Sequence, residues 1–250
     1  MNRIKKIIDN KKVDEAIDHL KKVYSMIPGT KGCIENHDKC KSWCCFCQNP
    51  QILYSEFLNT WKFVLKNWNT EDIINLIRRA LNNYLSKETI KGCIFFNKET
   101  RFCNQHRTRG FNCRLYGIVP KEDFKRKLDK LRTEYDDNGL LFKDQCELVS
   151  THDDKEVSQK NYDKWWNKIK KAETFLGISD EEIFDGPEGS YLSYHDHLLL
   201  QIFPIDTMVE LTQIRMFGDD KDKQMAIDSL IEQINKNIAR TMNKNGNEKS

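Results

Sequence analysis

The stretch CIENHDKCKSWCCFC, Cys33 to Cys47, contains five cysteines in fifteen residues, and two of them, Cys44 and Cys45, are adjacent. The chain has 250 residues, which is long enough to bury a hydrophobic core without disulfide bonds. It has nine cysteines, and only Cys146 lies outside the span from Cys33 to Cys113. In a reducing compartment such a cluster indicates a metal site or redox chemistry more than a disulfide framework.

The spacing within this stretch has a geometric consequence. If residues 39–47 are helical, Cys40, Cys44 and Cys47 lie at i, i+4 and i+7 and share one stripe. Cys45 then points about 100° away from Cys44. Thiolates are soft ligands that suit zinc, copper(I) or iron–sulfur clusters, and without a cation they repel one another. The alternative is that cysteines fill a tight helix interface as small apolar residues, which explains one cysteine better than five.

A second group of cysteines follows at intervals of ten residues: Cys93, Cys103 and Cys113. Metal sites are commonly assembled from two separated ligand segments, so this group can supply the second half of one site. The spacing fits neither the ferredoxin run nor the paired knuckles of a zinc ribbon. The candidate metal ligands are therefore Cys33, Cys40, Cys44, Cys45, Cys47, Cys93, Cys103 and Cys113.

Most of the remaining sequence has helical character. Helices are expected over 13–27, 52–68, 71–85, 121–135, 158–176, 191–217 with a bend or break at Pro204, and 220–242. Thr70 and Ser158 are the expected amino-terminal caps of two of them. Between Cys93 and Gln105, two short apolar runs flank polar residues as in a β-hairpin.

The expected fold is therefore mainly α, a helical domain with a cysteine-rich metal-binding region and a small β-hairpin. We expect a single domain over 1–250, with the cysteine-cluster region at about 28–120, a helical remainder at 121–243 and a disordered tail at 244–250. No internal repeat is visible in the sequence.

Charge and hydropathy exclude several classes of function. The net charge is +3, from 41 basic and 38 acidic residues mixed along the chain, which leaves no concentrated basic face for nucleic acid. The amino-terminal stretch does not resemble a secretory signal, and no run of about 18 uncharged apolar residues is present. We expect a cytoplasmic protein that binds neither nucleic acid nor a membrane and that acts with a protein or redox partner.

The order of the cysteines, together with the block CIFFNKETRFCNQHRTRGFNCRLYG at 93–117, resembles the YkgJ-like cysteine-cluster family, the CxxCxxCC proteins described as zinc- or iron-chelating domains. The second block of that family resembles a cysteine, a short apolar run, C-x-I-Y-x-x-R-P-x-x-C-R and an aromatic residue. The resemblance covers about Cys33 to Pro120. It implies a metal-binding role for this half of the chain.

The chain departs from the family pattern at several positions. Six residues separate Cys33 from Cys40 and three separate Cys40 from Cys44, where the family usually has two. Gly110 stands at the position of the family's proline, and Cys47 is additional. These differences leave the first ligand and the number of metal ions open.

Four residues near the second block are candidates for a supporting role beside the metal. Arg109 and Arg114 could offset the negative charge of four thiolates, although a solvated basic stretch explains them equally well. His106 occupies the family's tyrosine position, which favours packing over ligation, and Tyr116 provides the aromatic residue of the block.

Further along the chain, the pair His195 and His197 is typical of a helix surface rather than of a metal site. Trp165 and Trp166 are interpreted as core residues or as an interaction face.

The cysteine content favours an iron–sulfur cluster of the 4Fe–4S type over zinc, because the thiols exceed the four that one tetrahedral zinc needs. Such a protein would act in electron transfer or in the maturation of a metallocentre or another protein. One alternative is an enzyme with an open cluster iron, or with a spare nucleophilic thiol such as Cys45 or Cys47 for sulfur transfer. Another is a structural zinc site that stabilises an interaction module. No catalytic residue is identified from the sequence.

Overall fold

The computed structural model describes residues 10–31, 43–46, 49–88, 91–120, 149–154, 156–185 and 189–247. The helices are α1 (Asn10–Tyr24), α2 (Trp43–Phe46), α3 (Tyr54–Asn67), α4 (Thr70–Leu85), α5 (Phe111–Leu115), α7 (Gln159–Phe175), α8 (Asp180–Ile183), α9 (Tyr194–Ile202), α10 (Ile205–Phe217) and α11 (Asp220–Asn247). The strands are β1 (Thr30–Lys31), β2 (Gln51–Leu53), β3 (Phe96–Asn97), β4 (Phe102–Cys103), β5 (Ser150–Thr151) and β6 (Tyr191–Ser193). They form three antiparallel pairs, β1–β5, β2–β6 and β3–β4. The mainly helical fold with a small hairpin is confirmed.

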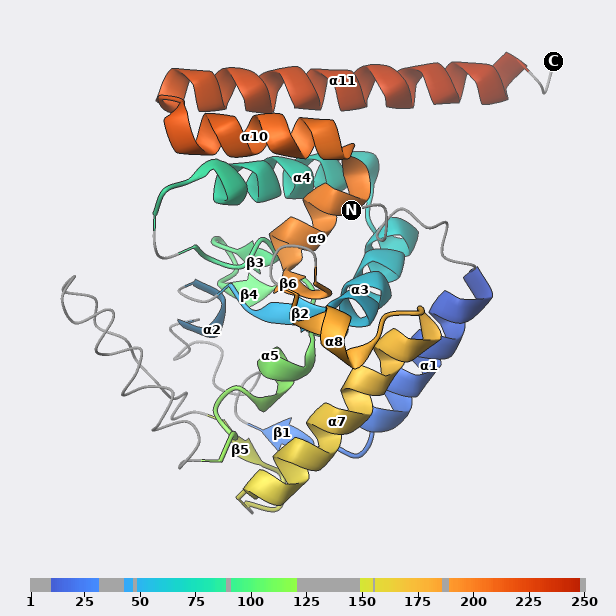
Figure 1. The fold of residues 1–250 in the computed structure, drawn as a ribbon, viewed down its shortest axis with the longest axis vertical. Coiled ribbons are helices and arrows are strands. Elements are labelled where there is room, and N and C mark those ends of the chain that lie inside the picture. Colours follow the sequence, from blue (N-terminus) through green and yellow to red (C-terminus); the bar gives the residue numbers. More distant parts are fainter. Residues whose placement is uncertain are drawn as a thin grey trace.

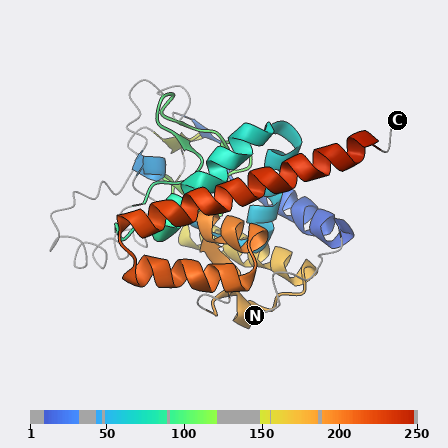
Figure 2. The ribbon, with the colours of Figure 1, turned by 90° about the horizontal axis from the view of Figure 1, so that it is seen from above.

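The helices lie in two groups (Figure 1). At one end, α4 packs beneath α10 and α11; at the other end, α1 lies along α7, and α3 and α9 run between the groups. Seen from above, α11 crosses α4, α10 diverges to one side of α11, and the carboxyl-terminal end of α11 extends past both (Figure 2). The hairpin β3–β4, helix α2 and helix α5 lie together on one side of this scaffold (Figure 1).

Two hydrophobic cores meet at β2. Residues of α3, α4, α9, α10 and α11 form the first core, and residues of α1, α5 and α7 form the second. Ile52 packs into the first core and Leu53 into the second, because successive residues of a strand point to opposite faces. The strand pair β2–β6 therefore joins the two cores.

The expected caps and breaks are correct in part. Ser158 caps α7 by accepting a hydrogen bond from the Asn161 backbone at 3.3 Å, as expected. The expectation for Thr70 is wrong: Asn69 has the extended backbone of a cap and accepts from the Asp72 backbone at 2.8 Å. The predicted break at Pro204 is confirmed, because proline has no N–H to continue α9 and instead precedes the first turn of α10.

The expectation that His195 and His197 lie on a helix surface is wrong. Both are buried in α9, with 5% and 1% of their area exposed. The His197 ring lies against the rings of Tyr54 and Phe57, and its Nε2 donates to the Ile52 carbonyl at 3.1 Å. Helix α9 is enclosed by α3 and α4, so that polar residues on its inner face must find partners inside the protein.

Several expectations concern other parts of the chain. The helix at 121–135 and the cysteines Cys33, Cys40, Cys47 and Cys146 lie outside the described residues. Helix α11 continues through Asn247 and so includes residues 244–247 of the tail for which disorder was expected. Trp165 is a core residue, as one of the two interpretations proposed. Among the described helices, none combines the length and apolar character that a membrane crossing requires.

A buried carboxylate, Glu56, connects three elements of the fold. It is 1% exposed, and its Oε2 accepts from the Leu53 backbone at 3.0 Å in the first turn of α3. Its Oε1 accepts from the Phe111 backbone at 2.7 Å and from the Tyr24 hydroxyl at 2.5 Å. Glu56 thus links α3 to α1 and to the first residue of α5.

A second buried carboxylate, Glu173 of α7, makes stability depend on pH. Its Oε1 accepts from the Ser55 backbone at 2.8 Å. Burial raises the pKa of Glu173 to about 7, against about 4.3 in an unfolded chain. The folded state therefore favours the protonated acid, and this contribution is complete below about pH 4 and is lost as pH rises to about 7.

We predict that Glu173→Gln becomes more stable relative to the unmodified protein as pH rises from 4 to 8, by up to about 3 kcal/mol. The amide stays uncharged over this range and still offers an oxygen to Ser55. Thermal unfolding of both proteins at matched pH values measures the difference. A difference that does not change with pH would contradict the prediction.

Candidate metal centre

Five thiols from four segments converge beside β2 and α3. Helix α2 carries two of them, the loop before β3 one, strand β4 one and helix α5 one; they are Cys44, Cys45, Cys93, Cys103 and Cys113. In the sequence, the helical pair α3 and α4 lies between α2 and the other three segments. The backbone N–H of Cys93 donates to the Cys45 carbonyl at 2.7 Å, so the chain after this helical detour returns to α2.

The hairpin that carries Cys103 is the one expected from the sequence. Phe96 of β3 faces Cys103 of β4, and Asn97 faces Phe102. The Asn97 side chain accepts from the backbones of Glu99 and Thr100 at 2.9 and 3.0 Å, which closes the turn. The hairpin thus presents Cys103 next to Cys93.

The five thiols influence one another. The sulfur atoms of Cys44 and Cys45 are 3.8 Å apart although the residues are adjacent in α2. Hydrogen bonding to Cys103 and then to Cys44 raises the pKa of Cys45 far above its usual value, and the bond from Cys45 lowers the pKa values of Cys44 and Cys103. Burial, followed by the charge of Cys103, raises the pKa of Cys93 to about 12. Burial and then the charges of Cys93 and Cys103 raise the pKa of Cys113 well above its usual range. The thiols therefore belong to one electrostatic group, from which protons must leave when a cation binds.

Arg109 lies beside this group, as the sequence suggested. Its guanidinium interacts electrostatically with Cys44, Cys103 and Cys113. Its Nη1 donates to His106 Nε2 at 2.7 Å and its Nη2 to Thr30 Oγ1 at 3.4 Å. Its buried Nε has no hydrogen-bond partner in the described part of the chain.

The other supporting candidates have different positions. Arg114 donates to the carbonyls of Arg109 and Arg107, both at 2.9 Å, and its guanidinium lies 4.2 Å from the centre of the Tyr24 ring. Its role is to hold the loop that carries Arg109. Burial, followed by the charge of Arg109, lowers the pKa of His106 to about 4, so His106 is neutral and accepts from Arg109. Tyr116 directly follows the last residue of α5, at its carboxyl-terminal cap.

Two further residues at the site were not expected from the sequence. Arg79 of α4 interacts electrostatically with Cys93. The backbone of Gln105 hydrogen-bonds the Cys103 thiol, and this helps to lower the pKa of Cys103 after the larger effect of Cys45. The Nε of Arg79 and the Nε2 of Gln105 are buried and, among the described residues, lack an acceptor. The sequence carries no signal for Arg79, because only the tertiary fold brings α4 next to the hairpin.

The close packing at the start of α5 explains why residue 110 is a glycine. The Gly110 N–H donates to the Tyr194 hydroxyl at 3.1 Å, and a Cβ on Gly110 would lie 2.9 Å from Ile52 Cγ2. A proline here would lose the hydrogen bond and crowd β2. The start of α5 is thereby packed closely against β2, with Glu56 binding the next backbone N–H.

The described residues contain no group of three or more histidine, cysteine, aspartate or glutamate side chains that is arranged to hold a metal ion. Three of the eight candidate ligands, Cys33, Cys40 and Cys47, lie outside those residues. Comparison of the chain with family models, with curated proteins and with solved structures finds no match.

We predict that Glu56→Ala lowers the free energy of unfolding by roughly 2 to 5 kcal/mol, because three buried donors lose their shared acceptor. Chemical denaturation at neutral pH measures the change. Glu210→Ala on the exposed side of α10 is the control and is expected to change stability by less than about 0.5 kcal/mol. Equal effects of the two substitutions would show that Glu56 does not connect α1, α3 and α5 energetically.

Proposed function

We propose that this chain is a metal-binding protein that carries an iron–sulfur cluster, of the 4Fe–4S type, held by cysteines from two separated segments. The observation that carries the proposal is that five thiols from four segments influence one another electrostatically, and that the Cys93 backbone N–H donates to the Cys45 carbonyl, which brings the chain after α4 back to α2. Cysteine thiolates are the usual ligands of such clusters. We further propose that the chain is related to the YkgJ-like family, on the motif order alone.

The buried donors around the thiols support an anionic, sulfur-rich group. Three side chains each have a buried N–H without an acceptor among the described residues: Arg79, Gln105 and Arg109. An unpaired buried donor is costly, and a charged one more so. A cluster bound by four thiolates is anionic, and its sulfurs accept hydrogen bonds from nearby N–H groups. The residues present therefore fit such a group.

The cluster would supply reversible one-electron chemistry when bound. The residues that would hold it are the cysteines of the hairpin, α2 and α5. Arg109 would balance its charge. This arrangement suits electron transfer or the maturation of a metallocentre or protein, with a protein as the redox partner, in the cytoplasm.

A second candidate function is enzymatic. Five described thiols exceed the four ligands of one cluster, so one thiol could serve as a nucleophile for sulfur transfer. Cys45 is the described thiol that the sequence suggests for this role, but its hydrogen bonds to Cys103 and Cys44 raise its pKa and disfavour the thiolate that a nucleophile needs. A structural zinc site is the third candidate and differs from both in having no redox activity.

We predict that protein purified without oxygen after expression with ample iron is brown, with a broad visible absorption shoulder that dithionite bleaches. Iron, sulfide and zinc analysis of the same sample decides between the metals. Colourless protein with stoichiometric zinc would exclude the cluster and favour the structural zinc site.

We also predict that Cys44→Ser and Cys103→Ser each lower metal content and thermal stability, because folding and metal binding are linked when ligands come from distant segments. Cys146→Ser is the matched control, since this cysteine lies outside both cysteine groups, and it should retain the metal. Metal content per chain and the midpoint of thermal unfolding are the measurements. If either of the first two variants keeps full metal and stability, that cysteine is not a required ligand.

A further inference from the structure

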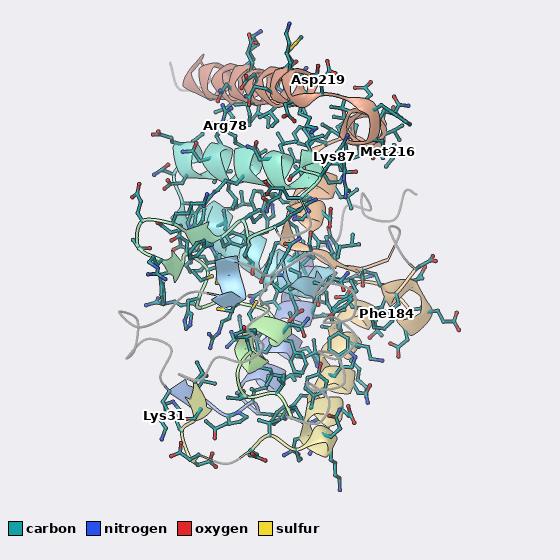
Figure 3. All side chains as sticks on the ribbon, turned by 90° about the vertical axis from the view of Figure 1, so that its left-hand side faces the viewer. Lys31, Arg78, Lys87, Phe184, Met216 and Asp219 are labelled. Carbon is teal, nitrogen blue, oxygen red and sulfur yellow. The ribbon has the colours of Figure 1, made fainter. Side chains whose placement is uncertain are left out.

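Two consecutive arginines of α4, Arg78 and Arg79, face different surroundings. Arg78 lies between α4 and α11 (Figure 3), where its Nη1 donates to Asp228 at 3.0 Å. Arg79 is half-buried and is turned toward the hairpin, because successive helix residues point about 100° apart. The chain thus places one of the two charges near solvent and the other beside the thiols.

Helix α4 holds the segment with Cys93 at two points. Arg79 Nη1 donates to the Phe96 carbonyl at 3.3 Å, and Phe96 is the residue that pairs with Cys103. One turn further along α4, Asn83 Nδ2 donates to the Gly92 carbonyl at 2.7 Å. Cys93 lies between these two contacts, so Arg79 is anchored within the same few residues as the thiol it influences.

The Nε–H of Arg79 is a further donor near the thiols. Its Nε is buried without a partner among the described residues, and its guanidinium interacts electrostatically with Cys93 and Asp72. Partial burial lowers the pKa of Arg79, which reflects the cost of removing this charge from water. Such a donor is satisfied by an anionic acceptor in its neighbourhood.

We propose that Arg79 donates its Nε–H to the metal–thiolate centre on the Cys93 side and raises the midpoint potential of that centre. The inference rests on the proposed iron–sulfur function. Reduction adds one electron to an already anionic group, and a nearby positive charge stabilises the reduced state more than the oxidised state. Helix α4, which contains no cysteine, therefore sets how easily the centre accepts an electron.

Four variants of the full-length protein test this role: Arg79→Gln, Arg79→Lys, Asn83→Ala and Arg78→Gln. Arg79→Gln removes the charge, whereas Arg79→Lys keeps it. Asn83→Ala removes the other contact to the Cys93 segment without changing charge, and Arg78→Gln removes a charge from the side of the same helix that faces α11. Each is purified without oxygen, its iron content is determined, and its midpoint potential is measured by a dye-mediated redox titration followed by absorbance.

In Arg79→Gln, the oxidised-to-reduced ratio at a fixed potential should rise about tenfold, which for a one-electron couple is a shift of about 59 mV to lower potential. Arg79→Lys should stay nearer to the unmodified protein, and Asn83→Ala and Arg78→Gln should leave the potential unchanged. If Arg79→Gln loses the iron, retention of iron and potential in Arg79→Lys shows that the charge is what the centre requires.

An unchanged potential in Arg79→Gln would overturn the inference while leaving the cluster itself intact. Equal shifts or equal iron loss in Arg79→Gln and Asn83→Ala would also overturn it, because packing of the Cys93 segment would then explain the effect. Unmodified protein without any iron–sulfur signal would overturn the proposed function and this inference together. The three results are distinguished by the iron content of the unmodified protein and by the Asn83→Ala control.

Discussion

The carboxylate of Glu56 is the constraint on which the arrangement of this protein depends. It is buried where the two hydrophobic cores meet and accepts three hydrogen bonds, from Tyr24, Leu53 and Phe111. Burying an acid costs free energy, which the three donors offset. Because one carboxylate of α3 satisfies donors of α1, β2 and α5, these elements can occupy only a narrow range of relative positions. Cys113 lies two residues after Phe111 in α5, so the hydrogen bond from Phe111 to Glu56 also fixes the position of the Cys113 thiol.

Around this junction, the fold brings together parts of the chain that are far apart in sequence. Strand β2 leads directly into α3, and the pair α3–α4 returns the chain so that Cys93 binds the backbone of Cys45. The hairpin then adds Cys103 and α5 adds Cys113. The four segments that carry these thiols are brought together only by folding, so any ligand that needed thiols from more than one of them would be coupled to folding. The helices are thus the framework that assembles the thiols.

The charges near the thiols suggest how such a centre would be tuned. Arg109 comes from the cysteine-rich block, whereas Arg79 comes from a helix that contributes no ligand. His106, neutral at physiological pH, accepts a hydrogen bond from Arg109, and Arg114 holds the loop in between. Two positively charged side chains therefore lie near the thiols, Arg109 from the loop before α5 and Arg79 from α4. An anionic centre in this environment would be stabilised by both guanidinium groups.

The sequence alone was sufficient for the local features. Helical periodicity, the Ser158 cap, the break at Pro204 and the hairpin around Asn97 depend on neighbouring residues. The cap at Asn69 is also local, because Asn69 accepts from the Asp72 backbone three residues further on, and the expectation from the sequence placed this cap one residue too late. Other features depend on contacts between distant segments: the burial of His195 and His197, and the position of Arg79 beside Cys93. Periodicity shows that a helix has two faces but does not show what covers each face, and for α4 and α9 both faces are covered by other elements. Only the tertiary structure decided which polar side chains are buried and which of them lie next to the thiols.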